Sequence, residues 1–204
     1  MKELLGERFL VERSTRAEVP AAIFRELDQK NFDDFENHWR PILVAGRARV
    51  SSSDEAATIN VQDSHWEWVD KAIDAQRIMG RDTFAVECAD RTQGLMLTDV
   101  GFGRLPSHHG RELVYVELLA TAPWNRPKLV PDPIFKGAGR VLISTAISLS
   151  VDLGFGGRIG LHSLPQSESW YRDIGGFTHV EFDPAKKMHI FEMTESDAVA
   201  FVSD

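Results

Sequence analysis

The chain has 204 residues, the length of one large domain and enough to bury a substantial core. Hydrophobic residues make up 43% of the chain and charged residues 26%, a balance that excludes wholesale disorder. Acidic residues outnumber basic ones by 31 to 23, for a formal net charge of −8, so nucleic-acid binding is not expected. Cys88 is the single cysteine, which excludes an internal disulfide and a cysteine-based metal site. No run approaches the roughly 20 apolar residues of a membrane span, so we expect no membrane partner. Charges interrupt the first fifteen residues, so we expect no signal peptide and a cytoplasmic location.

The predicted elements begin with a mainly helical part over residues 1–80. Apolar residues recur every three or four positions between 17 and 49. A capping-box pattern at Ser64 and Glu67 predicts a helix that runs to about Met79. Alternating patterns then predict strands at 83–88, 95–100 and 113–122, with a Gly/Pro/His loop over 102–110.

The C-terminal half alternates helices with strands. The patterns predict a buried helix at 138–153, a strand at 158–162, a short helix at 166–174, a hairpin of strands at 177–182 and 188–193, and a tail at 195–204. This order indicates one domain of the α/β or α+β class, built on a mixed sheet.

Two glycines, Gly137 and Gly139, stand at the start of the buried helix, just after a loop. Glycines there let a ligand approach the backbone, and the N–H groups of the first helical turn attract an anion such as a pyrophosphate. Lys136 adds a positive charge beside them. The spacing matches neither a Walker loop nor a dinucleotide fingerprint, whose third glycine would fall at Leu142. A tight turn without a ligand is the alternative.

Four ordered segments carry a family resemblance. They are Tyr115-Val-Glu117-Leu-Leu119-Ala-Thr121-Ala-Pro123, Phe135-Lys-Gly137-Ala-Gly139-Arg-Val-Leu142, Arg158-Ile-Gly-Leu161 and Trp170-Tyr171-Arg-Asp-Ile-Gly175-Gly-Phe177. Together, over about residues 113–182, they resemble the GNAT superfamily of N-acetyltransferases. Runs at 65–71, 122–125 and 160–166 also resemble a bacterial branch of GNAT-like proteins. Two departures concern cofactor contacts: Ile134 stands where the family has Gln or Arg, and residues 124–133 lengthen the linker.

The resemblance implies a splayed mixed β-sheet flanked by helices, with a helical N-terminal extension and an acyl-CoA-binding core over 81–194. The strand at 113–122 would part from the strand at 158–163, and the pantetheine arm of acetyl-CoA would lie in the gap. The implied cofactor-binding residues are Leu119, Ala120 and Thr121 on the strand, and Phe135, Lys136, Gly137, Ala138, Gly139 and Arg140 around the pyrophosphate.

Glu117 is an unusual residue for the middle of a strand. Alternation places it on one face with Leu113, Tyr115, Leu119 and Thr121, and leaves Val114, Val116, Leu118 and Ala120 to pack against the buried helix. Glu117 is either a catalytic base that takes a proton from an ammonium substrate or a structural carboxylate paired to Arg104 or Arg111.

Tyr171 occupies the position where many GNAT relatives place a tyrosine near the CoA sulfur. Its phenol could protonate the leaving thiolate, or the ring could simply pack with Trp170. A strand N–H near Thr121 would meet the oxyanion of the tetrahedral intermediate.

His65, Trp66 and Trp68 form a cluster that is either a core anchor or the wall of an acceptor pocket. Helical spacing suits Trp66 to packing, so His65, Trp68 and Tyr115 are the candidate substrate contacts. A metal is not expected, because the pair at 108–109 has no third ligand with sequence support.

The predicted function is transfer of an acetyl group from acetyl-CoA to a primary amine of a small molecule, amino acid or peptide, by direct attack in a ternary complex. The alternatives are a non-catalytic acyl-CoA-binding module and an acyltransferase with a different acyl-CoA, for which Arg104 or Arg126 could supply a cation. The resemblance also makes a homodimer possible.

Overall fold

The computed structural model describes residues 2–100 and 110–203, which share one nine-stranded sheet in the order β6-β1-β2-β3-β4-β5-β7-β9-β8. The strands are β1 (Glu3–Glu12), β2 (Glu18–Arg25), β3 (Arg81–Cys88), β4 (Arg91–Asp99), β5 (Val114–Thr121), β6 (Phe135–Lys136), β7 (Ile159–Ser163), β8 (Thr178–Asp183) and β9 (Met188–Met193). The sheet is mixed, as predicted, because β5 and β7 run parallel and the other paired strands antiparallel.

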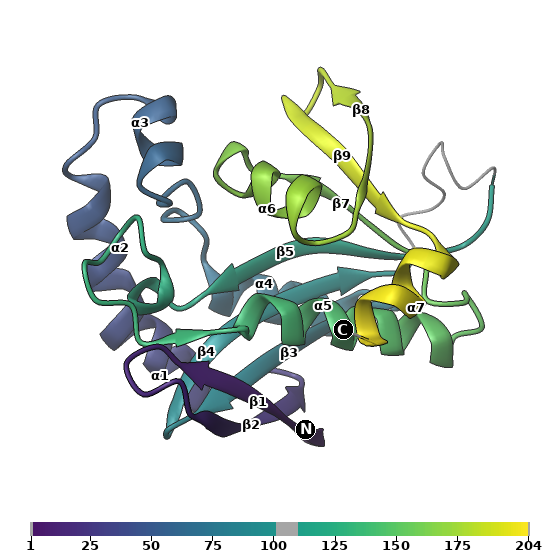
Figure 1. Cartoon of the computed structure of the whole chain (residues 1–204), viewed down its shortest axis with the longest axis horizontal. Coiled ribbons are helices and arrows are strands. Elements are labelled where there is room, and N and C mark those ends of the chain that lie inside the picture. The colour runs from purple at the N-terminus through teal and green to yellow at the C-terminus, as the bar shows by residue number, and fades with distance from the viewer. Residues whose placement is uncertain (1, 101–109, 204) are drawn as a thin grey trace.

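Helices cover both faces of the sheet (Figure 1). They are α1 (Gln29–Asp34), α2 (Arg40–Arg47), α3 (Ser53–Thr58), α4 (Trp68–Arg77), α5 (Ala138–Asp152), α6 (Glu168–Asp173) and α7 (Glu195–Ser203). A π-helical turn, Phe35–Trp39, joins α1 to α2, and Pro41 stands in the first turn of α2, where a missing N–H is tolerated. Helix α5 lies on one face of β3, β4 and β5, and α4 lies behind β3 and β4.

The sheet opens between β5 and β7. Their parallel ladder holds Val114, Tyr115 and Val116 against Ile159, Gly160 and Leu161 and extends no further. On its other side, β5 stays paired with β4 as far as Thr121. The last part of β5 therefore offers one edge of its backbone to the gap, and the predicted splay of the two strands is confirmed.

A β-bulge interrupts β5 at Glu117. Leu97 pairs with Leu118, but the next residue of β4, Thr98, pairs with Val116, so Glu117 is the extra residue. Before the bulge, Val114 and Val116 face the core under α5.

After the bulge the two faces are exchanged. Leu119 now packs with the core under α5, whereas Leu118 and Ala120 pack with the core formed by α1 to α4. The prediction that Leu118 and Ala120 face the buried helix was wrong, because simple alternation does not anticipate an extra residue.

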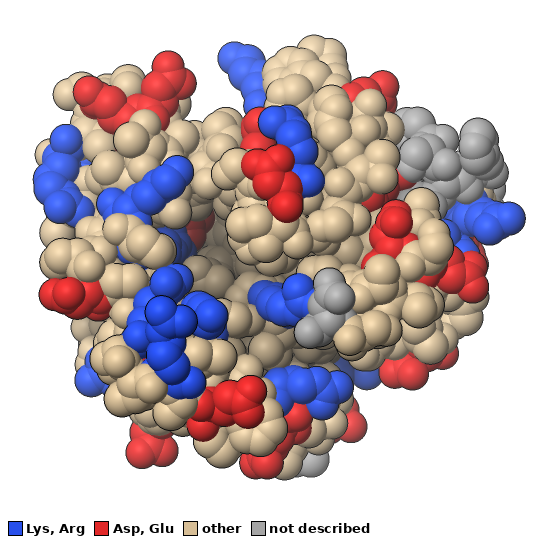
Figure 2. Space-filling view, viewed as in Figure 1, with Lys and Arg blue, Asp and Glu red and all other residues tan. Residues whose placement is uncertain are grey.

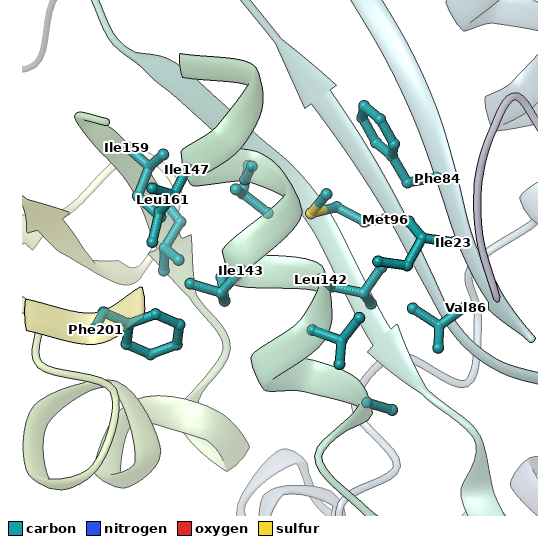
Figure 3. Close-up of a cluster of buried hydrophobic side chains, with 14 of the residues drawn as sticks. Ile23, Phe84, Val86, Met96, Leu142, Ile143, Ile147, Ile159, Leu161 and Phe201 are labelled. Carbon is teal, nitrogen blue, oxygen red and sulfur yellow. The ribbon is translucent and has the colours of Figure 1, made fainter. Parts of the chain in front are cut away.

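Helix α5 is buried on two sides, as its composition predicts. Figure 3 shows Leu142 directed toward Ile23 and Val86 of the sheet, while Ile143 points to Phe201 of α7. The helix lies so close to β4 that a side chain at Gly94 would meet Leu142 Cδ1 at 2.9 Å. This close packing fixes the first turns of α5 relative to β4.

Three boundaries predicted from the sequence need correction. Residues 1–80 are not mainly helical from the start, because β1 and β2 form a hairpin in which Ala21 and Ile23 alternate into the core. The segment 195–204 is not a tail, since α7 buries Ala198 and Phe201. Helix α4 begins only at Trp68, and the predicted capping box is replaced by an ion pair between Glu67 and Arg40. The expected loop over 102–110 lies outside the described residues, apart from Gly110.

None of the described helices is both long and apolar enough to cross a membrane.

Candidate functional site

A cavity of about 320 Å³ lies where β5 leaves β7, between α6 and the start of α5. Its walls include every residue predicted to bind the cofactor: Leu119, Ala120, Thr121, Phe135, Lys136, Gly137, Ala138, Gly139 and Arg140. Figure 2 shows a hollow in this region with Lys and Arg side chains around it. We call it the first cavity.

The start of α5 presents unused backbone donors to the first cavity. Gly137 precedes the helix with a φ of 108°, a left-handed conformation that favours glycine, and no side chain caps the helix. The first backbone bond of the helix joins the Val141 N–H to the Gly137 carbonyl at 2.9 Å, so the amides of residues 138–140 have no acceptor within the helix. Such a terminus suits an anion.

The side chains around the start of α5 show which of the predicted pyrophosphate-binding groups are available to a ligand. Arg13 and Lys136 add positive charge to the cavity wall, whereas the Arg140 guanidinium donates to the Phe201 carbonyl at 2.6 Å. The Phe135 amide is not available to a phosphate, because it donates to Asn125 Oδ1 at 2.8 Å. Phe135 lines the cavity, but its amide cannot be one of the pyrophosphate donors, which corrects the role that the resemblance implied for this residue.

The inserted segment 124–133 is anchored by a buried ion pair. Arg126 is only 5% exposed and donates to both carboxylate oxygens of Asp63 at 2.7 Å, and also to the Thr121 carbonyl. Burial alone would raise the pKa of Asp63, but the charge and hydrogen bonds of Arg126, with a bond from Gln166, hold that pKa below its usual value. Because its charge is neutralised, Arg126 is not the cation expected for a larger anionic acyl group.

A second cavity, of about 290 Å³, adjoins the first. Its walls include Glu117, Tyr115 and His65, all of which the sequence placed at a catalytic or acceptor site. Leu119, Ser167 and Tyr171 line both cavities and form what we call the junction. The two cavities are therefore neighbours that share these three residues as walls.

A loop from the N-terminal half is held beside the junction. Gln62 and Gln166 form two reciprocal hydrogen bonds. The backbone N–H of Gln62 donates to Gln166 Oε1 at 2.8 Å, and the backbone N–H of Gln166 donates to Gln62 Oε1 at 2.9 Å. This pairing joins the loop before α4 to the segment before α6, and it brings His65 and Trp66 to the wall of the second cavity.

No protein-family model and no curated protein matches this chain. Solved structures do match it in fold. The PaiA N-acetyltransferase from Thermoplasma acidophilum, in complex with coenzyme A, is 13% identical, with a TM-score of 0.54 over 85% of this chain and 98% of that one. FeeM, an N-acyl amino acid synthase from uncultured soil microbes, is 11% identical, with a TM-score of 0.53 over 88% and 93% of the two chains. The GNAT domain of S. lividans PAT is 13% identical, with a TM-score of 0.51 over 92% and 96%.

The chain has the GNAT fold. At this level of identity the likeness shows the fold alone, and it confirms the fold that the sequence resemblance implied.

Within this GNAT fold, Tyr171 stands at the junction. It is 7% exposed and packs its ring edge-on against Trp170 and Phe177, so the packing role weighed for it is present. Burial raises the pKa of its phenol. The hydroxyl makes no hydrogen bond with the described part of the chain, and because its pKa is raised it carries its proton at neutral pH.

Glu117 pairs with a different arginine from the two that the sequence suggested. Its Oε2 lies 3.2 Å from Arg81 Nη2, and the same guanidinium bonds Asp99 at 2.8 Å. Arg104 lies outside the described residues. The carboxylate both takes part in an ion pair and lines the second cavity, so the geometry is compatible with either role weighed for it.

The roles of the two tryptophans are exchanged. Trp68 is 1% exposed and sits in the core of α1 to α4, so the expectation that it contacts substrate is corrected. Trp66 lines the second cavity instead, edge-on to Trp68. Helix α4 begins at Trp68, so residues 65 and 66 precede it and helical spacing does not apply to them.

Three polar residues of the second cavity region were not anticipated: His162 of β7, Asp183 of β8 and Lys186 of the β8–β9 turn. The Tyr115 hydroxyl lies 2.7 Å from His162 Nδ1 and 3.3 Å from Lys186 Nζ, and His162 Nε2 lies 3.1 Å from Asp183. The alternation of β7 indicated a histidine on one face, but no spacing motif links it to the hairpin. Among the described residues, no group of three His, Cys, Asp or Glu side chains could hold a metal ion.

We expect His162 to titrate below its ordinary pKa of about 6.5. Burial and the positive charge of Lys186 lower its pKa, and they outweigh the opposing bond and charge of Asp183. Because the folded state resists protonation here, stability should fall as the pH drops through the unfolded pKa. An NMR titration of the ring protons measures this pKa. Lys186→Met should raise the His162 pKa, and an unchanged value would contradict the place of the ammonium beside the ring.

Proposed function

We propose that this protein is an acetyl-CoA-dependent N-acetyltransferase whose acceptor is a primary amine. The observation that carries the proposal is the pair of cavities that meet at Leu119, Ser167 and Tyr171. An enzyme that transfers an acyl group directly needs two binding sites with one shared point, where the amine and the thioester come together.

The first cavity has the features that coenzyme A would need. The uncapped start of α5 suits the pyrophosphate, with Lys136 and Arg13 nearby as countercharges. The free edge of β5 beyond Val116 can pair with the amide groups of the pantetheine arm. When bound, acetyl-CoA supplies an activated acyl group.

The residues at and beyond the junction would handle two protons. An ammonium substrate must lose a proton before its nitrogen can attack, and Glu117 would accept that proton directly or through a water. Departure of the thiol leaves a thiolate that must gain a proton, and the Tyr171 hydroxyl would donate it. The net change is one new C–N bond for one broken C–S bond, and the second proton that the nitrogen loses as the amide forms balances the proton that the thiolate gains.

The Glu117–Arg81 ion pair favours the alternative, a module that binds acyl-CoA without turnover. Titration calorimetry with acetyl-CoA, with desulfo-CoA and ATP as controls, followed by an amine screen for thiol release, separates the two. Binding of both CoA forms but not ATP, together with amine-dependent thiol release, supports the transferase. Binding without release for any amine favours the module, and no binding at all rejects both.

Glu117→Gln is expected to lower turnover at neutral pH by about a hundredfold and to leave acetyl-CoA binding intact. The loss should shrink above about pH 9, because an amine with a pKa near 8 is then deprotonated by the solvent. Steady-state rates between pH 6 and pH 10, at roughly saturating acetyl-CoA, measure this.

Arg81→Met is the companion variant, since it removes the Glu117 ion pair, together with the bond to Asp99, and keeps the Glu117 carboxylate. If both variants lose stability and neither loses turnover, Glu117 is a structural residue.

A further inference from the structure

Large apolar side chains form much of the wall of the second cavity. Five of them are half-buried in the folded chain and line the cavity: Trp66, Leu118, Leu119, Leu164 and Met188. They come from the segment before α4, from β5, from the residue after β7 and from the start of β9. Apolar surface that a chain leaves uncovered inside a concavity is typical of a site for an apolar ligand.

Four polar side chains of the same wall already have partners within the protein. Glu117 pairs with Arg81 at 3.2 Å. The Tyr115 hydroxyl lies 2.7 Å from His162 Nδ1 and 3.3 Å from Lys186 Nζ. A ligand that bound here through several polar groups of its own would have to replace these bonds, and a buried group that loses its partner is costly.

The other polar side chains of the wall change this picture little. The Ser163 hydroxyl donates to the Leu164 carbonyl at 2.9 Å. His65 is exposed, and Ser167 belongs to the junction. The apolar side chains are therefore the part of the wall that a ligand can cover without breaking a bond within the protein.

Trp66 is the largest of these apolar side chains, and the fold holds it in place. Its backbone N–H donates to the Asp63 carbonyl at 3.1 Å, and the Asp63 carboxylate is fixed by two bonds from Arg126. Its ring lies edge-on to the buried ring of Trp68, with centroids 6.1 Å apart. A wall that is ordered before the ligand arrives costs little conformational entropy on binding.

We infer that the acceptor is a primary amine carried by an apolar group, a short alkyl chain or one aromatic ring, which packs against Trp66 in the second cavity. This inference rests on the proposed transferase function and names the substrate class of its acceptor site. The amine would lie toward Glu117 and the junction, and the apolar group would cover Trp66, Leu164 and Met188. The volume of about 290 Å³ suits one small apolar group better than a peptide.

The first test uses two matched series of acceptors. The n-alkylamines from propylamine to hexylamine are compared with amino alcohols of the same length, in which a hydroxyl replaces the terminal methyl, and acetyl-CoA-dependent thiol release is followed. We expect kcat/KM to rise about fourfold for each added methylene, the factor that burial of one CH₂ group gives. Each amino alcohol should be at least about tenfold poorer than its alkylamine, because its hydroxyl would be buried against apolar side chains.

The second test changes Trp66. In Trp66→Ala the KM for hexylamine should rise about tenfold and the gain per methylene should fall below about twofold, with kcat nearly unchanged. Trp66→Phe should restore part of the gain. Acetyl-CoA affinity should not change in either variant, since Trp66 does not line the first cavity.

Ile42→Ala is the matched control. Ile42 packs against the same core of α1 to α4 as Trp66 and lines neither cavity. This variant should lose stability in thermal melting and keep the full gain per methylene. If it flattens the alkylamine series as much as Trp66→Ala does, Trp66 acts only through core packing and the inference is overturned.

Calorimetry separates the inference from the function beneath it. Hexylamine titrated into the protein with bound desulfo-CoA, which cannot transfer an acyl group, should bind at least about tenfold more tightly than its amino alcohol. If such binding occurs but acetyl-CoA releases no thiol with any amine, the proposed transferase fails and the apolar-amine site stands. If thiol is released equally from both series, or at a rate independent of chain length, the function stands and the inference is overturned. A flat amine series together with faster transfer from hexanoyl-CoA than from acetyl-CoA would assign the apolar wall to the acyl chain, and would also overturn it.

Discussion

Replacement of Tyr171 by phenylalanine is expected to slow acetyl transfer by about ten- to a thousandfold while leaving acetyl-CoA affinity unchanged. The variant keeps the ring, and with it the contacts to Trp170 and Phe177, and loses only the hydroxyl at the junction. That hydroxyl has no bond with the described part of the chain to lose, so the folded state should not be weakened. The expected loss is therefore one of proton donation.

Single-turnover rates with saturating acceptor measure the chemical step, and thermal melting and calorimetry on the same sample measure fold and binding. Rates close to those of the wild type would remove Tyr171 from the mechanism. A fall in melting temperature and affinity together with the rate would mean that the residue acts through packing instead.

Gly139→Val is expected to weaken acetyl-CoA binding by at least about a hundredfold, because two methyl groups would project over the backbone donors that receive the pyrophosphate. The fold should accept the change. A Cβ at Gly139 would meet Thr121 Cγ2 at 3.6 Å, an ordinary contact, and the residue lies in the first turn of α5.

Gly139→Ala provides a graded control. Alanine favours a helix over glycine by about 1 kcal/mol, so this variant should melt no lower than the wild type. Its affinity, measured by calorimetry, should fall between those of the wild type and the valine variant. An unchanged affinity in folded Gly139→Val would reject the start of α5 as the phosphate site.

The elements that the sequence predicted well are those whose signals are local. The strands and helices after residue 80 follow from alternation and from helical spacing, and the hairpin strand at 188–193 has the predicted bounds. Strand β2 of the first hairpin was missed because residues 17–49 mix strand and helix signals, which a single helical spacing merged. Helix α7 was missed because its two buried residues, Ala198 and Phe201, form no recognisable pattern by themselves and join the core only through their packing with α5.

The two cavities also differ in how far their residues could be predicted from local sequence signals. The residues of the first that were predicted to bind the cofactor lie in two short segments, 119–121 on β5 and 135–140 at the start of α5, so local motifs identify them. The polar wall of the second is assembled from β5, β7 and the β8–β9 turn, and no sequence spacing connects Tyr115, His162 and Lys186. The partner of Glu117 was likewise out of reach, because Arg81 becomes its neighbour only through the pairing of β3, β4 and β5.

Because of the bulge at Glu117, the side chains of β5 alternate in one phase before this residue and in the opposite phase after it. Upstream, the even-numbered side chains face α5. Downstream, the odd-numbered ones do, which is how Leu119 reaches the junction. Deleting one residue here would leave the composition almost unchanged. It would nevertheless exchange the two faces of the strand, so that cofactor-facing side chains would point to the core and core-facing ones to the cofactor. A variant of β5 that is one residue shorter should therefore fail to fold, whereas most single side-chain substitutions in the same strand should leave the fold intact.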